Sequence, residues 1–275
     1  MSPAPPASRR TRVALVAGEE GRPRLELATG LLAPQVVRVA GSRAEVALVA
    51  TTATLLGGDE VRLDVEVGPG TWLDLRDVAG TVAYHGRGRA CRVDVWLRVA
   101  PGATLTWAGE PLVVSGGADV TRTLDVDVAE GGRLLLRDTV ALGRTGESGG
   151  DLRCTTGTTV AGRPALVEQL RLGPSARSRP GVLGHARVVD TVTALGWQPM
   201  ATPAVPGADV YTLEQGGVVA RVLAGEAHES GLRTLWDRWR AQLEVGDGPA
   251  PGDGRGRGDG RGRGDGRGRG GEPSL

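Results

Sequence analysis

The side chains best suited to binding a metal ion lie in one short stretch of the sequence, around His85. The chain has three histidines and two cysteines, and among these only His85 and Cys91 lie close together. The paired spacings HxH, HxxxH and CxxC, which are typical of metal sites, are absent. Cys91 shares its parity with Val93 and Val95, which predicts a buried and inert thiol. A metal site at His85 and Cys91 is the alternative.

A glycine-paired acidic corner is the second candidate for chemistry. Gly57, Gly58 and Asp59 introduce a predicted strand and occur only once, although the strand pattern that follows them recurs later in the chain. Asp59 is therefore a candidate for contacting a metal ion or a partner. An aspartate in a turn often binds its own backbone, so a structural Asx-type turn is the simpler explanation.

Acidic residues near turns raise the question of an enzyme. Glycoside hydrolysis needs two carboxylates that flank the bond to be cleaved, and five acids lie at or near predicted turns: Asp59, Asp77, Asp119, Asp138 and Glu147. Acids are frequent in turns for local hydrogen-bonding reasons alone. A β-solenoid enzyme acting on a polysaccharide is therefore an alternative hypothesis. The chain has no G-x-S-x-G motif, so nucleophilic catalysis is not indicated.

Composition excludes several further chemistries. The chain has no lysine, and so neither a P-loop lysine nor a Schiff-base lysine. Its net charge of +1 gives no bulk attraction to nucleic acid. Two cysteines without a CxxC motif predict reduced thiols, and no apolar run approaches the roughly 18 residues of a membrane span. We expect a soluble cytoplasmic protein that contacts no membrane.

Strands are the elements that must position these side chains. From Glu60 to Val67, apolar and charged residues alternate strictly, which is the period of a half-buried strand. The pattern V-x-V-x-x-G-x-x-L-x-L is then centred in turn on Gly70, Gly102 and Gly131. A period of roughly 30 residues predicts an all-β fold of stacked hairpins or a β-helix-like solenoid. A plain β-sandwich is the alternative.

One strong helix is predicted, over residues 226–245. Its apolar residues, Trp236 and Trp239 among them, fall on one stripe. Such a stripe indicates either packing against the body of the protein or an exposed aromatic surface for a partner. We place a partner-binding surface on this carboxy-terminal helix and nearby loops, with Arg144 and Glu147 of a glycine-rich surface loop as further candidates.

Two segments flank a single predicted domain of residues 12–245. Residues 1–11 and 246–275 are predicted to be disordered, because they are too poor in apolar side chains to bury a core. The carboxy-terminal segment contains the unit DGRGRG three times. Arg-Gly tracts can bind RNA, which makes RNA binding an alternative function. Each unit also carries an aspartate and no aromatic residue is interleaved, so a solubilising tail is favoured.

Four segments together resemble a known family. TLLGGDEVRLDVEVGPG at Thr54–Gly70 is similar to an LLGGD-x3-L-x-V-x-V-G-x-G block, and GTVAYH at Gly80–His85 matches part of an A-T-K-V-Y segment. APGATLTW at Ala100–Trp107 is similar to G-A-x-L-x-W, and LGRTGES at Leu142–Ser148 to G-R-x-x-x-G-E. These blocks belong to the urease accessory protein UreD family, called UreH in some organisms. The resemblance extends from about residue 12 to 245 and is densest in residues 54–150.

The resemblance implies a function without catalysis. UreD-like proteins form a complex with UreF and the GTPase UreG, and this complex docks on apo-urease. Nickel then passes to the urease active site, so the metal is cargo in transit and not a resident cofactor. The resemblance also implies that the β stack contains a route for nickel.

Overall fold

The computed structural model describes residues 10–18, 23–52, 55–179, 181–200 and 205–246. The two predicted disordered segments, residues 1–11 and 246–275, fall almost entirely outside these ranges. Strand β1 begins at Arg10, two residues before the expected start of the domain, and the side chain of Thr11 is fully buried. No helix in the described part of the chain has the length and apolar character that a membrane span requires.

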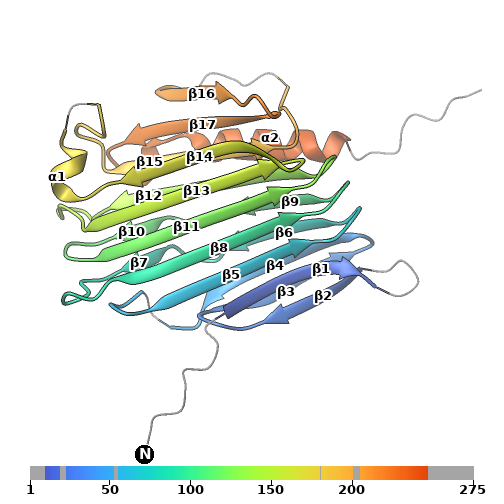
Figure 1. The fold of residues 1–275 in the computed structure, drawn as a ribbon, viewed down its shortest axis with the longest axis horizontal. Helices are drawn as coiled ribbons and strands as arrows, with labels where there is room; N and C mark the ends of the chain where they lie inside the picture. Colours follow the sequence, from blue (N-terminus) through green and yellow to red (C-terminus); the bar gives the residue numbers. More distant parts are fainter. Residues whose placement is uncertain (1–9, 19–22, 53–54, 180, 201–204, 247–275) are drawn as a thin grey trace, which may run out of the picture.

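Two sheets lie face to face and form the body of the protein (Figure 1). Sheet A has the strand order β14-β13-β11-β8-β5-β1-β2. Its bounds are β1 (Arg10–Ala17), β2 (Pro23–Ala28), β5 (Glu60–Val67), β8 (Cys91–Val99), β11 (Asp119–Val128), β13 (Asp151–Val160) and β14 (Arg163–Arg171). Sheet B has the order β16-β17-β15-β12-β9-β6-β4-β3, with β10 joined to β12 and β7. Its bounds are β3 (Leu32–Ala40), β4 (Arg43–Ala50), β6 (Trp72–Asp77), β7 (Thr81–Ala83), β9 (Thr104–Ala108), β10 (Leu112–Val114), β12 (Arg133–Leu142), β15 (Val188–Leu195), β16 (Ala208–Thr212) and β17 (Gly217–Ala224).

The predicted repeat is confirmed, and it builds a solenoid. Each glycine turn leads from a strand of sheet A to a strand of sheet B, as in β5 to β6, β8 to β9 and β11 to β12. The two strands of a unit therefore do not bond to each other as a hairpin does. Each strand pairs in parallel with its equivalent in the next unit, which places Val65, Leu97 and Val126 side by side. Antiparallel pairs, such as β1 with β2 and β13 with β14, lie at the ends of the stack.

The repeating glycines have a conformational role. Gly70, Gly102 and Gly131 have φ angles of 65°, 65° and 72°, in the left-handed region that favours glycine. They also stack on one another, because a Cβ atom built on Gly102 would lie 3.9 Å from the amide nitrogen of Gly70. The turns thus form a column along the edge of the solenoid.

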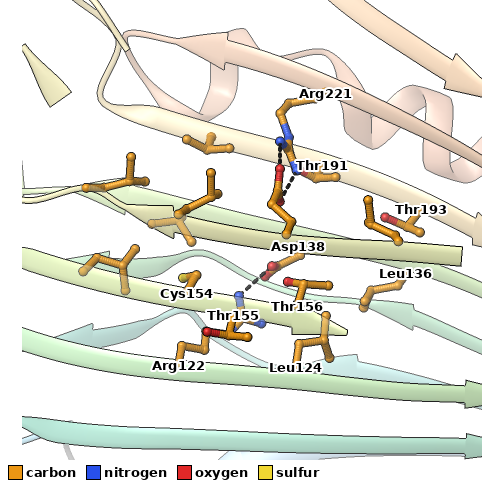
Figure 2. A pocket seen from close by; sticks show the side chains of 17 residues that line it. Arg122, Leu124, Leu136, Asp138, Cys154, Thr155, Thr156, Thr191, Thr193 and Arg221 are labelled. Atoms are coloured by element: carbon orange, nitrogen blue, oxygen red, sulfur yellow. Dashed lines mark hydrogen bonds and ion pairs between the residues drawn. The ribbon is translucent and has the colours of Figure 1, made fainter. Parts of the chain in front are cut away.

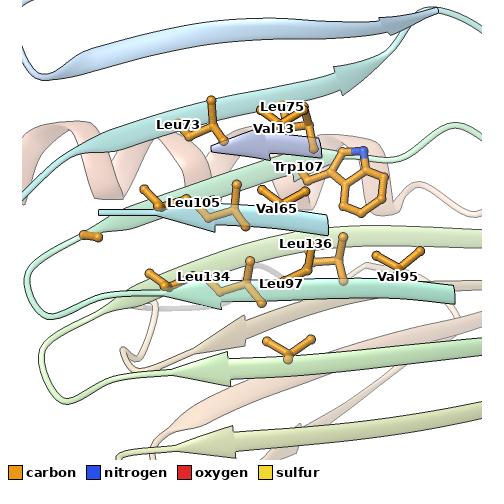
Figure 3. Close-up of a cluster of buried hydrophobic side chains, with 14 of the residues drawn as sticks. Val13, Val65, Leu73, Leu75, Val95, Leu97, Leu105, Trp107, Leu134 and Leu136 are labelled. Atoms are coloured by element: carbon orange, nitrogen blue, oxygen red, sulfur yellow. The ribbon is translucent and has the colours of Figure 1, made fainter. Parts of the chain in front are cut away.

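Apolar side chains fill the space between the sheets in two separate clusters. The glycine-turn cluster includes Val65, Leu97, Leu105 and Leu134 (Figure 3). A second group, which we call the loop-side cluster, lies toward the opposite ends of the strands and includes Cys91, Val120, Val140 and Leu152. The inward positions alternate along each strand, as the sequence pattern predicts.

Helix α2 (Leu232–Gly246) packs on the outer face of sheet B, and a short helix α1 (Pro174–Arg177) follows β14. Helix α2 begins later than the predicted residue 226, because a single 3-10 turn (Ala227–Glu229) and Gly231, at a φ angle of 68°, precede it. Ser230 donates a hydrogen bond to the buried carboxylate of Asp190, which also binds Arg137 at 2.9 Å. This buried network fixes the start of the helix to the sheet.

Candidate functional site

Charged residues occupy inward positions between the two apolar clusters. On β11, Arg122 stands between Val120 of the loop-side cluster and Leu124 of the glycine-turn cluster. On β12, Asp138 likewise separates Leu136 from Val140. The same level of the stack holds further charged side chains, and we call the set the polar band: Asp77, Arg122, Asp138, Glu168 and Arg221.

Strand register aligns the polar band along the axis of the solenoid. In sheet B, Asp138 pairs with Thr191 of β15, and Thr191 pairs with Arg221 of β17. In sheet A, Arg122 pairs with Cys154 of β13. Because paired residues of neighbouring strands point to the same face of a sheet, these side chains form lines that cross the strands. The band therefore runs from strand to strand through the interior.

Two ion pairs cross the gap between the sheets (Figure 2). Arg122 of sheet A donates to Asp138 of sheet B at 2.5 Å. Arg221 of sheet B donates to both carboxylate oxygens of Glu168 in sheet A, at 2.5 and 2.8 Å. Burial alone would lower the pKa of Arg122, but the charge of Asp138 and its hydrogen bond raise it above the ordinary value. Both arginines therefore stay charged inside the protein.

Two cavities lie along the polar band. The larger, of about 110 Å³, is lined by Asp77, Trp107, Glu110 and Arg122 together with apolar side chains. The smaller, of about 50 Å³, is lined by Arg122, Asp138, Cys154, Glu168 and Arg221, among others. A water molecule takes about 30 Å³ of liquid volume. Both cavities therefore have room for at least one water molecule.

Asp77 is the most perturbed carboxylate of the band. Burial raises its pKa to about 6, even though its oxygens accept hydrogen bonds from the Glu110 amide at 3.0 Å and from Trp107 Nε1 at 3.2 Å. Burial also raises the pKa of the Cys154 thiol to about 11, so this sulfur is protonated at neutral pH. The band thus offers oxygen and sulfur atoms without a preformed set of charged ligands.

Asp77 and Asp138 belong to the polar band, but most of the other sequence-predicted candidates lie in or beside loops at the ends of the strands. We call loops 55–59, 84–90, 115–118 and 143–150 the corner stack, since backbone hydrogen bonds join neighbouring loops. The Gly58 amide donates to Ala90 at 2.8 Å, and the Gly86 amide donates to Gly117 at 3.2 Å. Glycine is required at these contacts because a Cβ atom on Gly57 would lie 2.4 Å from the Gly86 carbonyl oxygen.

Each of the three candidate metal ligands already makes contacts within the protein. Asp59 accepts a hydrogen bond from the Leu56 amide at 2.8 Å, which closes the turn, although the bond runs backward along the chain and not forward as in an Asx turn. His85 Nδ1 accepts from the Arg87 amide at 3.0 Å. Cys91 is buried in the loop-side cluster, and burial raises the pKa of its thiol to about 11. Within the described residues, no group of three or more His, Cys, Asp or Glu side chains is placed to hold a metal ion.

Arg144 and Glu147 bind each other and fasten one corner loop to the next. Arg144 donates to Glu147 Oε1 at 2.5 Å, and Glu147 Oε2 also accepts from the amides of Arg144 and Gly116. The bond from the Arg144 side chain lowers the pKa of Glu147 to about 2. Arg144 lies over the ring of Tyr84, with 5.6 Å to the centroid, and about half of its side chain is exposed.

The two tryptophans of α2 are not exposed on the surface of the protein. Trp239 is fully buried and Trp236 is 6% exposed, in a cluster that joins the helix to sheet B. Of the two interpretations, packing against the body therefore holds, and the prediction of Trp236 and Trp239 as partner-facing residues is corrected. Their apolar area is already covered by the chain's own strands.

Comparison with known proteins places the chain in a family. Residues 13–251 match the model of the UreD urease accessory protein family. The chain belongs to the UreD family. It is similar to urease accessory protein UreD 1 of Streptomyces griseus subsp. griseus, with 43% identity over 226 residues that cover 79% of this chain and 86% of the relative. It is also similar to urease accessory protein UreD of Frankia alni, with 36% identity over 82% of this chain and 89% of the relative.

UreD membership confirms the family resemblance seen in the sequence, and it confirms that the chain is an accessory protein and not itself an enzyme. Sequence reasoning missed the polar band of this UreD chain. Asp138 was placed at or near a turn, whereas it lies within β12 and points inward. A signal was present, because Arg122 and Asp138 occupy positions where the alternating pattern demands apolar residues.

Proposed function

We propose that this UreD-family chain is a scaffold that docks a UreF-like and UreG-like complex on apo-urease and assists nickel insertion. Its family membership as a urease accessory protein supports the proposal. The proposed site of action is the cytoplasm, in keeping with the two free cysteines. UreF-like protein, the UreG-like GTPase and the urease apoprotein are the proposed partners, and nickel is cargo.

The polar band is the proposed route for nickel. A conduit needs polar positions that bind an ion weakly enough to release it, whereas a closed ligand cage would hold it. Asp77, Glu110 and Asp138 supply oxygen atoms along the two cavities, and Cys154 supplies a protonated sulfur. The apolar clusters on both sides of the band confine a charged species to this line.

The corner stack and the exposed side of α2 are the proposed docking surfaces. Arg144 is about half exposed at the corner stack and is held in a fixed position by Glu147. On α2, Arg233 and Asp237 are each at least half exposed, at the groove between the helix and sheet B. These residues replace the buried tryptophans as the surface that the helix offers to a partner.

Reconstitution with UreF-like and UreG-like proteins, apo-urease and nickel tests the proposal. We expect Asp138→Asn to lower urease activation and nickel content while the accessory complex still assembles. Asp125→Asn is the matched control, because Asp125 is an exposed aspartate on β11 of sheet A, outside the band. Full activation without this chain would contradict the scaffold function. Full activation by the Asp138 variant would contradict the route.

The docking surface is tested separately by pull-down. Arg144→Ala is expected to weaken capture of the partner complex or of apo-urease. Arg153→Ala is the control, since Arg153 is a similarly exposed arginine that pairs with Asp119 on sheet A. Equal capture by both variants would remove Arg144 from the interface.

A further inference from the structure

Arg122 has a position that no other residue of the band shares. Among the described residues, its side chain alone lines both cavities. It extends from β11 of sheet A into the gap, and only 12% of the side chain is exposed. The two cavities therefore meet at a guanidinium group.

The charges on either side of Arg122 are opposite to its own. Asp138, on the side of the smaller cavity, binds it directly at 2.5 Å. The carboxylate of Asp77, in the larger cavity, also acts on it electrostatically. Asp77 and Asp138 come from β6 and β12, which flank β9 in sheet B. The Arg122 guanidinium thus lies between the carboxylates of Asp77 and Asp138 and is ion-paired with Asp138.

We propose that Arg122 is an ionic gate between the two cavities, an inference that rests on the proposed nickel route. A divalent cation entering the larger cavity meets Asp77 and Glu110 first. To pass onward, the cation must replace the Arg122 guanidinium as the partner of the Asp138 carboxylate. The long arginine side chain then moves away. Arg122 keeps Asp138 neutralised when no cargo is present, so the isolated protein does not trap the ion. Arg122 acts through Asp138 and is a positioning residue, not a ligand.

Nickel retention by the purified full chain tests the gate directly. Equilibrium dialysis against Ni²⁺ is compared for the wild type, Arg122→Gln and Arg122→Met. Each variant removes the positive charge that neutralises the Asp138 carboxylate, and affinity rises with the number of charged ligands, so we expect retention at least about tenfold tighter than in the wild type. Arg122→Met combined with Asp138→Asn is expected to return retention to the wild-type level.

Two controls show whether a change in Ni²⁺ retention comes from the loss of Arg122 itself, from the loss of any arginine or from misfolding. Arg43→Met removes an arginine from the outer face, where Asp74 keeps its bonds to Arg240 and Thr106, and it is expected to leave retention unchanged. Circular dichroism establishes folding, and Arg122→Gln decides the test if Arg122→Met does not fold, because glutamine still donates a hydrogen bond to Asp138.

The outcomes distinguish the gate from the proposed function. Unchanged Ni²⁺ retention by a folded Arg122 variant overturns the gate, whatever urease activation shows. Tighter retention together with slower urease activation by an assembled complex supports it. Failure of the wild-type chain to support activation overturns the proposed function, and with it the role of the gate in delivery, even where retention changes.

Discussion

Gly57 and Gly70 are glycines for different physical reasons. Gly70 has a φ angle of 65° and open space around a built Cβ atom, so Gly70→Ala carries mainly the cost of the left-handed conformation, about 1 kcal/mol. A Cβ atom on Gly57 would lie 2.4 Å from the carbonyl oxygen of Gly86. Backbone atoms must shift to relieve that contact, and Gly57→Ala is expected to cost about 2 kcal/mol or more. Urea unfolding of both variants measures the difference, and a smaller effect at Gly57 would show that the corner stack is loosely packed.

Asp77 is expected to make stability depend on pH. Its pKa is about 6 in the folded protein and 3.8 as the ordinary value, so the folded state binds the proton more tightly than the unfolded state. The contribution of protonation to stability is present below pH 4 and is lost as the pH rises through 6. It amounts to roughly 2 to 3 kcal/mol for a shift of this size.

Asp77→Asn isolates this contribution. We compare the free energies of unfolding of the wild type and the variant at pH 4 and at pH 7. We expect the difference between them to change by that amount, because the wild type loses stability relative to the variant as the pH rises. Urea titrations at several pH values provide the measurement. A difference that stays constant with pH would mean that Asp77 is not desolvated.

Helix α2 contributes to stability through its buried stripe. Trp239 is fully buried against sheet B, so Trp239→Ala removes a large apolar side chain and leaves a cavity. Such changes cost about 3 to 5 kcal/mol. Val245 is 81% exposed near the end of the same helix, and Val245→Ala should stay within about 0.5 kcal/mol of the wild type. Thermal and urea unfolding compare the two, and a small loss for Trp239→Ala would revive the exposed-face interpretation.

Strands and turns were predictable because their signals are local. The alternation from Glu60 to Val67 corresponds to β5, and the repeated glycines mark the turns into sheet B. Strand pairing was not predictable in the same way. A turn residue such as Gly70 looks the same whether its flanking strands bond to each other or to neighbouring units, and that choice depends on contacts distant in sequence.

The candidate site was harder to predict for the same reason. Arg122 and Asp138 each break an alternating pattern, which is visible locally. Their pairing across two sheets depends on the register of β11 with β8 and β13, and of β12 with β9 and β15. The family motifs located parts of the corner stack instead, since Gly57, Gly58 and the Arg144–Glu147 pair each lie within a short continuous motif.

The polar band follows from the parallel architecture of the solenoid. In-register pairing puts equivalent positions side by side, so one inward charged residue in each of several strands is enough to build an axial polar band. Two cross-sheet ion pairs neutralise much of its charge, which keeps the stack folded around a polar interior. Antiparallel strands at both ends complete the stack without continuing the repeat.

The carboxy-terminal segment is expected to be dispensable for urease activation and for RNA binding. Residues 247–275 lie outside the described structure and contain six arginines and five acidic residues. Their near balance gives little counterion release on a phosphate backbone, and no aromatic residue provides stacking. Deletion of residues 247–275 is therefore expected to leave urease activation, thermal stability and the affinity of the chain for RNA unchanged. Filter binding at two salt concentrations and the reconstituted urease assay measure these properties. A steeply salt-dependent RNA affinity that disappears on deletion would instead assign the segment to RNA.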